Sequence, residues 1–318
     1  MVARRKLEDF ASPVGDGFPT RQIAPHSTQK IHYLWKYADT GALATASPKA
    51  FPNARTYADL YASCGICETK KTHELSWGSA LACLQITKPF DLYFLNDIDP
   101  DAAAVLAQRA RNVGVSGATV FELDTRAAPD ALAHTKQIAE VVAPFGPKVV
   151  VATGDANTAA RYLAELMRPF GKRRYLLAFI DPFSAGYHWK AFQELAMYEP
   201  AMDVLALFPT AMDLGRNFTY YRNSAESGKK LDDYFGCEWR HIVDANPMHA
   251  EHDLRVLYEQ QMTKILDFKI GHPKGVGFTR VPLYHLIFGS KNNLGMTLWN
   301  DVNRRNAFEQ EELWLDGA

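Results

Sequence analysis

Acidic residues stand at the ends of several short apolar segments, at Asp59, Asp97, Asp155 and Asp181. A carboxylate in such a position binds ribose hydroxyls, an ammonium group or a metal ion, or it caps the helix that follows. In an open α/β sheet, ligands bind beyond the carboxyl ends of the parallel strands. We therefore expect these four side chains to meet at one edge that accepts a nucleoside-like ligand.

The loop at 59–65 begins with Asp59 and ends with Gly65, with small residues between them. Small residues let the backbone approach a ligand closely. Asp97 follows Asp59 by 38 residues. The spacing in dinucleotide sites is about 20 residues. We interpret residues 66–80 as the insertion that makes up this difference.

The third loop places two short polar side chains, Asp155 and Asn157, directly after Gly154. Such side chains suit an adenine amine or the polar tail of a ligand. Asp124, after the apolar segment 119–123, is an alternative for the same role. We prefer Asp155 because its helix leads directly into the next strand.

The fourth loop reads Asp181-Pro182-Phe183-Ser184. It resembles the Asp-Pro-Pro-Tyr signature of amino methyltransferases, although it has one proline. In those enzymes polar groups hold the target amine while the aromatic ring stacks on the base. A structural role for this loop remains an alternative. His188 then either borders a substrate pocket or precedes a helix that only packs.

Cysteine and histidine residues near the first loop offer a second kind of chemistry. Cys64, Cys67, His73 and Cys83 are the right residue types for a tetrahedral zinc site. Only Cys64 and Cys67 have the characteristic spacing, and Cys83 falls in an expected helix. We therefore expect small loop residues and a buried thiol, and no metal site.

Apolar runs alternate with helical patterns from residue 56 onward, which is typical of βαβ units and a parallel sheet. The segments 175–180 and 204–208 are apolar on both faces, as in central strands covered on both sides. We predict an α/β fold: a methyltransferase-like Rossmann sheet of five parallel strands, a C-terminal antiparallel hairpin, and helices on both faces. The expected strands are 57–61, 91–95, 119–123, 148–152, 175–180, 203–208, 277–281 and 283–288. The expected helices are 28–41, 79–86, 101–111, 131–142, 158–168, 189–197 and 254–268.

The chain is expected to form one domain over 28–318, preceded by a flexible N-terminal arm at 1–27 that is rich in proline, glycine and serine. Residues 211–250 are polar and aromatic without a clear period, and we interpret them as an insertion or cap. Arginine, asparagine and tyrosine interleave there, which suits either a nucleic-acid surface or a cap that buries its tyrosines. The residues in question are Arg216, Asn217, Tyr220, Tyr221 and Arg222.

Composition limits the function classes. The 318 residues carry a net charge of −1, so there is no global basic field for nonspecific nucleic-acid binding. No secretory signal and no segment near the ~18 apolar residues of a membrane span is present. Four cysteines do not indicate a disulfide scaffold. We expect a cytoplasmic protein without membrane contact.

An ordered set of motifs resembles the three-Cys-motif partner protein (TcmP) family over most of the chain. The matching stretches are Lys30-Ile31-x-x-Leu34-Trp35, Ala58-Asp59-Leu60-Tyr61-Ala62, Gly78-Ser79-Ala80-Leu81, Asn96-Asp97-Ile98-Asp99-Pro100, Gly154-Asp155-Ala156-Asn157, Phe179-Ile180-Asp181-Pro182-Phe183, Leu207-Phe208-Pro209 and Leu283-Tyr284-His285-Leu286-Ile287-Phe288. The resemblance implies a Rossmann-type methyltransferase fold. It also implies a partner with a three-cysteine motif, similar to radical S-adenosylmethionine enzymes, often in mobile elements.

One departure from that family lies in the first loop, where Ala-Gly-Pro-Gly is usual and this chain has Ala62-Ser63-Cys64-Gly65. If this position requires a positive φ, a serine there costs on the order of 1 kcal/mol.

Three functions fit these observations. The first is methyl transfer from S-adenosylmethionine to a nucleobase amine or another nucleic-acid acceptor. The second is a non-catalytic binding platform for a three-Cys-motif protein. The third is metal-assisted hydrolysis at the acidic edge. In the first, Asp181, Pro182 and Phe183 position the acceptor. The cofactor is then expected to contact Asp59, Tyr61, Ser63, Gly65, Asp97, Asp155 and Asn157.

Overall fold

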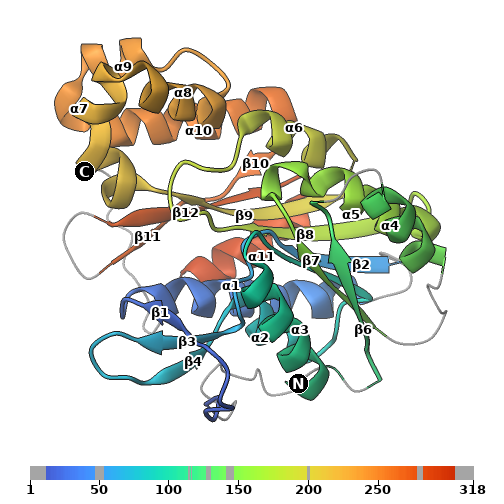
Figure 1. Ribbon diagram of the computed structural model, residues 1–318. Helices are drawn as coiled ribbons and strands as arrows, with labels where there is room; N and C mark the ends of the chain where they lie inside the picture. Colours follow the sequence, from blue (N-terminus) through green and yellow to red (C-terminus); the bar gives the residue numbers. More distant parts are fainter. Residues whose placement is uncertain are drawn as a thin grey trace.

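The computed structural model describes residues 12–46, 54–113, 115, 117–126, 130–140, 147–198, 201–277 and 282–304. A large sheet runs through the centre (Figure 1). Its strands are β2 (Ala54–Asp59), β5 (Leu92–Asp97), β6 (Thr119–Asp124), β7 (Lys148–Thr153), β8 (Arg174–Ile180), β9 (Met202–Phe208), β10 (Lys269–Ile270), β11 (Lys274–Val276) and β12 (Tyr284–Ser290).

The strand order is β10-β12-β9-β8-β2-β5-β7-β6, with β11 also paired to β12. The run from β9 to β6 is parallel, and β12 is antiparallel to β9, β10 and β11. This arrangement confirms the predicted methyltransferase-like α/β sheet. The six parallel strands of the described residues correspond to the six segments predicted before the hairpin, β6 among them, so the expected total of five was one too few.

Helices cover both faces of this sheet, as predicted (Figure 1). One face carries α1 (Ser27–Thr45), α2 (Ser79–Leu84), α3 (Pro100–Val113) and α11 (Asn293–Asn303). The other carries α4 (Asp130–Glu140), α5 (Ala159–Met167), α6 (Trp189–Tyr198) and α10 (Ala250–Leu266). Alternate residues of β8 point into the two cores: Leu176 and Ala178 enter one, and Leu177 and Phe179 enter the other. Burial on both faces explains the continuous apolar run in its sequence.

Several element boundaries differ from expectation. The first strand begins at Ala54 rather than Tyr57, and the last long helix begins at Ala250 and ends at Leu266. The helix α11 was not predicted. The first strand of the hairpin was expected at 277–281, but β11 ends at Val276, and 278–281 lie outside the described residues.

The segment 211–250 contains helices rather than irregular structure: α7 (Gly215–Asn223), α8 (Ala225–Phe235) and α9 (Arg240–Ala245). Together with α10 they form the helical layer at the top left of Figure 1, beyond the β9 and β12 end of the sheet. A π-helical turn, Thr210–Leu214, connects β9 to α7.

A second, three-stranded sheet is built from β1 (Arg21–Ile23), β3 (Ile66–Thr69) and β4 (Leu75–Trp77). β1 is parallel to β3, so part of the expected N-terminal arm pairs with part of the expected insertion. The buried Arg109 guanidinium donates to both carboxylate oxygens of Asp16 at 2.8 Å, and also to the backbone oxygens of Phe18, Pro19 and Cys64. These bonds fasten residues 16–19 to α3. Residues 1–11 lie outside the described part.

A buried carboxylate connects elements from both ends of the chain. Asp203 on β9 accepts hydrogen bonds from Tyr37 on α1 at 2.5 Å and from Tyr175 on β8 at 2.7 Å. Its other oxygen accepts from the Ser290 hydroxyl on β12 at 2.6 Å. Each oxygen is therefore satisfied by a hydroxyl from a distant element.

None of the described helices has the length and apolar character needed to cross a bilayer.

Candidate functional site

The chain reverses its progress across the main sheet between β2 and β8. It runs from β2 to β5 and on to β6 and β7 on one side, then returns to β8 on the other side of β2. Ligands of open α/β sheets bind at such a switch point, outside the carboxyl ends of the strands. Asp59 ends β2 and Asp181 directly follows β8, so these two acids flank the switch point.

Asp59 is fully buried and is held from three directions. The Tyr61 amide donates to its Oδ1 at 3.2 Å, the Tyr57 hydroxyl donates to Oδ2 at 3.3 Å, and the Ser79 hydroxyl also donates to the carboxylate. Burial, together with the charge of Asp181, raises its pKa from 3.8 to about 7, although these hydrogen bonds lower it. This fully buried side chain supports the first loop through the Tyr61 amide, and its contact with a cofactor stays a prediction.

Asp181 forms an ion pair with a residue of the first helix. The Lys30 ammonium lies 2.5 Å from Oδ2, and the two side chains are only 18% and 13% exposed. Burial raises the pKa of Asp181, and the Lys30 charge lowers it. The same ammonium lies 5.6 Å from the centre of the Tyr284 ring. Lys30 thus supplies the nearest compensating charge to the acid at the end of β8.

Asp97 is bonded to the first loop. Its Oδ2 accepts from the Ser63 amide at 2.7 Å, and its Oδ1 accepts from the Asp99 amide at 3.0 Å. Ser63 has φ +52°, the left-handed conformation in which serine is strained. Each carboxylate oxygen has a second lone pair, so Asp97 retains acceptor capacity for a hydroxyl of a ligand.

Gly65 is explained by packing. It has φ +84°, and a Cβ placed there would lie 2.7 Å from Cγ of Leu81 and 2.8 Å from a methyl group of Leu106. Its amino-acid type is therefore dictated by the contact of the loop with α2 and α3. The structure thus gives it a packing role, and its predicted contact with a cofactor stays a prediction.

Asn96 joins three strand ends, and the sequence-based reasoning did not assign it a role. Its Nδ2 donates to the Leu60 oxygen at 3.2 Å and to the Gly154 oxygen at 3.0 Å. These two bonds fix the orientation of the amide. Its Oδ1 is buried and has no hydrogen-bond partner among the described residues. An unpartnered buried acceptor costs about 1–3 kcal/mol, so this atom is positioned for a donor from a ligand or a water molecule.

Tyr61 lies where the strand-end charges converge. Burial raises the pKa of its hydroxyl, and the charges of Asp155, Asp181 and Asp97 raise it further. Its ring meets Tyr187 edge-on, with centroids 6.5 Å apart. The carboxyl ends of β5, β7 and β8 carry these three acids, and the three strands lie within one or two positions of β2 in the sheet. Asp59 lies beneath the same loop.

Asp155 and Asn157 bind protein atoms in this structure. Asp155 caps the short 3₁₀ helix Ala156–Thr158, accepting from the Asn157 amide at 2.9 Å. The Asn157 side chain donates to the Gly186 oxygen at 3.2 Å and accepts from the His188 amide at 2.7 Å. The capping role considered from the sequence is thus present, and Asn157 fixes the loop that follows Asp181.

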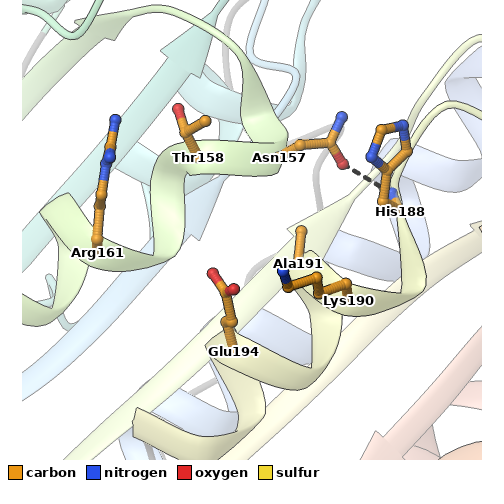
Figure 2. Close-up of a pocket in the computed structure, with 7 residues that line it drawn as sticks. All are labelled: Asn157, Thr158, Arg161, His188, Lys190, Ala191 and Glu194. Atoms are coloured by element: carbon orange, nitrogen blue, oxygen red, sulfur yellow. Dashed lines mark hydrogen bonds between the residues drawn. The ribbon is translucent and has the colours of Figure 1, made fainter. Parts of the chain in front are cut away.

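A pocket of about 260 Å³ lies beside this contact, between the amino ends of α5 and α6 (Figure 2). Figure 2 shows Asn157 bonded to His188 at one end of the pocket. The lining residues are Asn157, Thr158, Arg161, His188, Lys190, Ala191 and Glu194.

The other two residues predicted to position an acceptor differ in exposure. Pro182 is buried, whereas Phe183 is 72% exposed. The Arg21 guanidinium of β1 lies 4.3 Å from the centre of the Phe183 ring. The aromatic ring thus faces outward, and a residue of the N-terminal strand covers it.

The cysteine and histidine residues of the first loop do not form a metal site. No group of three or more His, Cys, Asp or Glu side chains is placed to hold a metal ion in the part of the chain that the structure describes. Cys64 and Cys83 are buried and Cys67 is half-buried. Burial raises the pKa of Cys67 to about 12, so its thiol is protonated at neutral pH.

Asp124, the alternative to Asp155, forms an ion pair of 2.6 Å with Arg126 at the edge strand β6.

Part of the segment 211–250 packs inward: the Tyr221 hydroxyl and the Asn217 amide both donate to Oδ1 of Asp213, at 2.7 and 2.8 Å. Tyr220 is 64% exposed. The segment therefore combines a buried polar cluster with outward-facing aromatic surface.

Lys30 and Tyr187 are further residues at this edge that sequence reasoning missed. Lys30 belongs to the motif Lys30-Ile31-x-x-Leu34-Trp35, and no neighbouring residue in the sequence indicates that its side chain reaches Asp181. Tyr187 is buried, and its hydroxyl has no partner within the described residues. It lies six positions after Asp181 in a loop whose course only the structure defines.

Comparisons with known proteins give little beyond the fold. No protein-family model and no curated protein matches this sequence. A solved complex of Trm1 from Pyrococcus horikoshii with S-adenosyl-L-methionine is similar, with a TM-score of 0.42 and 13% sequence identity. The match covers 86% of this chain and 58% of that one, which is less than two thirds of the length of the Trm1 chain.

Proposed function

We propose that this protein is an S-adenosylmethionine-dependent methyltransferase that acts on an amine of a nucleobase in a nucleic acid. One observation carries the proposal: Asp59, Asp97, Asp155 and Asp181 stand at the carboxyl ends of four adjacent parallel strands, β2, β5, β7 and β8, which include the switch point. The carboxylates at this edge can accept hydrogen bonds from the hydroxyl and ammonium groups of a ligand. They therefore suit a ligand that has both a ribose and an amino acid moiety.

The residues at this edge fit such a cofactor. Asp97 has free lone pairs for ribose hydroxyls, and the buried Oδ1 of Asn96 lacks a donor. We assign to the cofactor also Tyr61 and Ser63 from the loop after β2, and Asp155 and Asn157 from the loop after β7. Asp59 and Gly65 hold the loop in shape. When bound, S-adenosylmethionine supplies an electrophilic methyl group.

Asp181, Pro182 and Phe183 form the acceptor side of this proposal. The carboxylate of Asp181 accepts a hydrogen bond from the acceptor amine and orients its lone pair, while Lys30 holds the carboxylate in place. Orientation of this kind contributes several kcal/mol to a transfer reaction. The exposed ring of Phe183 offers a stacking surface for the base.

The test is calorimetry with S-adenosylmethionine and S-adenosylhomocysteine. We expect micromolar binding that Asp97→Ala weakens at least tenfold, because its carboxylate is the ribose acceptor. The matched control is Asp130→Ala, which removes an exposed acid from the first turn of α4. No binding by the wild-type protein, or equal loss in both variants, would exclude this function.

A non-catalytic platform for a three-Cys-motif protein is the second candidate. Two observations favour it: Ser63 is in a strained left-handed conformation, and Asp181 is already paired with Lys30. It predicts that the wild-type protein binds no S-adenosylmethionine but retains a three-Cys-motif protein in a pull-down. Cofactor binding without such retention would reject it.

A further inference from the structure

The pocket between α5 and α6 has a charge arrangement that the proposed cofactor site does not use. Arg161 lines it from α5 and Lys190 lines it from α6 (Figure 2). Glu194, one turn after Lys190, is the only acid that lines it. The pocket therefore carries a net positive charge within a protein whose overall charge is −1.

Both cations have donors to spare. The Nη2 atom of Arg161 donates to the Tyr162 hydroxyl at 2.8 Å. Within the described residues, the other N–H groups of this guanidinium remain available to a ligand. The Lys190 ammonium makes no ion pair or hydrogen bond within the described residues, even with Glu194 at i+4. A lysine that precedes a glutamate by four residues is the less favourable order for such a pair.

A neutral donor lies close to these cations. The His188 ring lines the same pocket and can donate. The Thr158 hydroxyl also lines it, but it already donates to the Asp155 backbone oxygen at 2.9 Å. The ten-residue helix α6 begins at this point and has no acidic residue in its first turn. The positive end of its dipole thus adds to the field of Lys190 instead of being neutralised.

Asn157 connects the pocket with the acceptor side of the proposed active site. Its amide bonds the Gly186 oxygen and the His188 amide, which belong to the loop that begins at Asp181. The pocket and Asp181 therefore lie along one short loop, at the same edge of the sheet. A polymer that places one unit at Asp181 extends toward this pocket with a neighbouring unit.

We propose that this pocket binds a backbone phosphate of the nucleic acid that carries the acceptor base, with Arg161 and Lys190 as its two charged contacts. The inference rests on the proposed function only in taking the acceptor to be a nucleic acid. A guanidinium and an ammonium, with the His188 ring in the same pocket, match the charge of a phosphodiester. One local cation pair also fits a protein without a global basic surface.

The test measures the affinity of the full chain for short single-stranded RNA and DNA oligonucleotides by fluorescence anisotropy over a salt series. We expect Arg161→Ala and Lys190→Ala each to weaken binding several-fold. Loss of one phosphate contact should also reduce the slope of log K against log salt by about 0.7. Glu194→Gln, which removes the opposing charge from the same pocket, should strengthen binding.

The matched control is Lys172→Ala. Lys172 is an exposed lysine at the amino end of β8, on the opposite edge of the sheet from the pocket. It should leave affinity and salt slope unchanged. Equal effects of Lys172→Ala and Lys190→Ala, or weaker binding by Glu194→Gln, would overturn the proposal. So would an adenosine monophosphate affinity equal to that of the oligonucleotides, because it would assign the pocket to a free nucleotide.

Calorimetry separates this proposal from the proposed function. Lys190→Ala should bind S-adenosylmethionine as the wild-type protein does, since Lys190 is not among the residues assigned to the cofactor. Oligonucleotide binding that depends on Lys190 in a protein that binds no S-adenosylmethionine would uphold the phosphate site and reject the methyltransferase. Cofactor binding without any oligonucleotide binding would reject the phosphate site and would still support a methyltransferase.

Discussion

Lys30 and Asp181 form an ion pair of 2.5 Å that bonds the first turn of α1 to the carboxyl end of β8. Both side chains are largely buried, so the pair is only weakly screened by solvent. It compensates the charge of one of the two acids that flank the switch point. The other acid, Asp59, has hydrogen-bond donors around it but forms no ion pair within the described residues.

Replacing Lys30 should leave a buried carboxylate without its counter-charge. We expect Lys30→Met to reduce the free energy of unfolding by about 3 kcal/mol, the scale for breaking a buried pair. Lys30→Met combined with Asp181→Asn should lose less than the two single variants together. Urea titrations of the four proteins measure this coupling. Strictly additive losses would show that the pair has no energetic coupling.

Ser63 offers a gain in stability. At φ +52° a serine is strained on the order of 1 kcal/mol, and glycine adopts this conformation freely. Ser63→Gly should raise the free energy of unfolding by about 0.5–1 kcal/mol, and its amide can still donate to Asp97. The control is Ser224→Gly, since Ser224 has φ −112° and caps α8, and this change should be slightly destabilising. A lower free energy of unfolding in both variants would contradict backbone strain at Ser63.

Asp59 should make stability depend on pH. Its pKa in the folded state is about 7, above the ordinary 3.8, so the folded protein binds more protons than the unfolded chain between these values. Stability contributed by this group is therefore highest below about pH 4 and falls until about pH 7. The full penalty is on the order of 4 kcal/mol.

Asp59→Asn removes this titration while keeping an oxygen acceptor for the Tyr61 amide. The difference in unfolding free energy between the variant and the wild type should grow in favour of the variant as the pH rises from about 4 to about 7. Above that range it should be constant. Denaturant titrations at several pH values measure this difference. Parallel curves for the two proteins would mean that the pKa of Asp59 is ordinary.

Arg109 should determine whether residues 12–23 stay in place. Arg109→Lys loses the two-pronged contact with Asp16 and most of the bonds to backbone oxygens, so we expect a cost of about 3 kcal/mol. Hydrogen exchange should increase over β1 and β3. The control is Arg111→Lys on the same helix, whose exposed pair with Glu122 contributes about 0.5 kcal/mol or less. Unchanged exchange in β1 after Arg109→Lys would refute the anchoring.

The central sheet was predictable because its strands are apolar on both faces. The start of β2 was missed because Arg55 and Thr56 are buried polar residues that break the apolar run. Arg55 is accommodated by Asp91 and by the backbone oxygens of Ala42 and Pro89, partners that lie outside the strand. No sequence pattern reveals that such a charge will be satisfied inside the fold.

The candidate site was predictable as an edge but not as a set of contacts. The positions of Asp59, Asp97, Asp155 and Asp181 follow from strand ends alone. Their partners do not, because Lys30 reaches Asp181 from a different element and Arg21 reaches Phe183 from β1. The helices α7 and α9 were missed because each buries a single residue, Tyr221 in α7 and Val243 in α9, and so has no wide apolar stripe. The helix α8 does bury one face, through Gly228, Leu231, Tyr234 and Phe235, and that spacing was overlooked.

The hydrogen bonds of Asp203 constrain how the chain is made. During synthesis, Tyr37, Tyr175 and Asp203 leave the ribosome long before Ser290 is added. Until then one oxygen of the carboxylate lacks its hydroxyl, and β9 presents an unpaired edge because β12 does not yet exist. A polypeptide released by a premature stop codon before β12 would retain both defects, and proteases should remove it quickly.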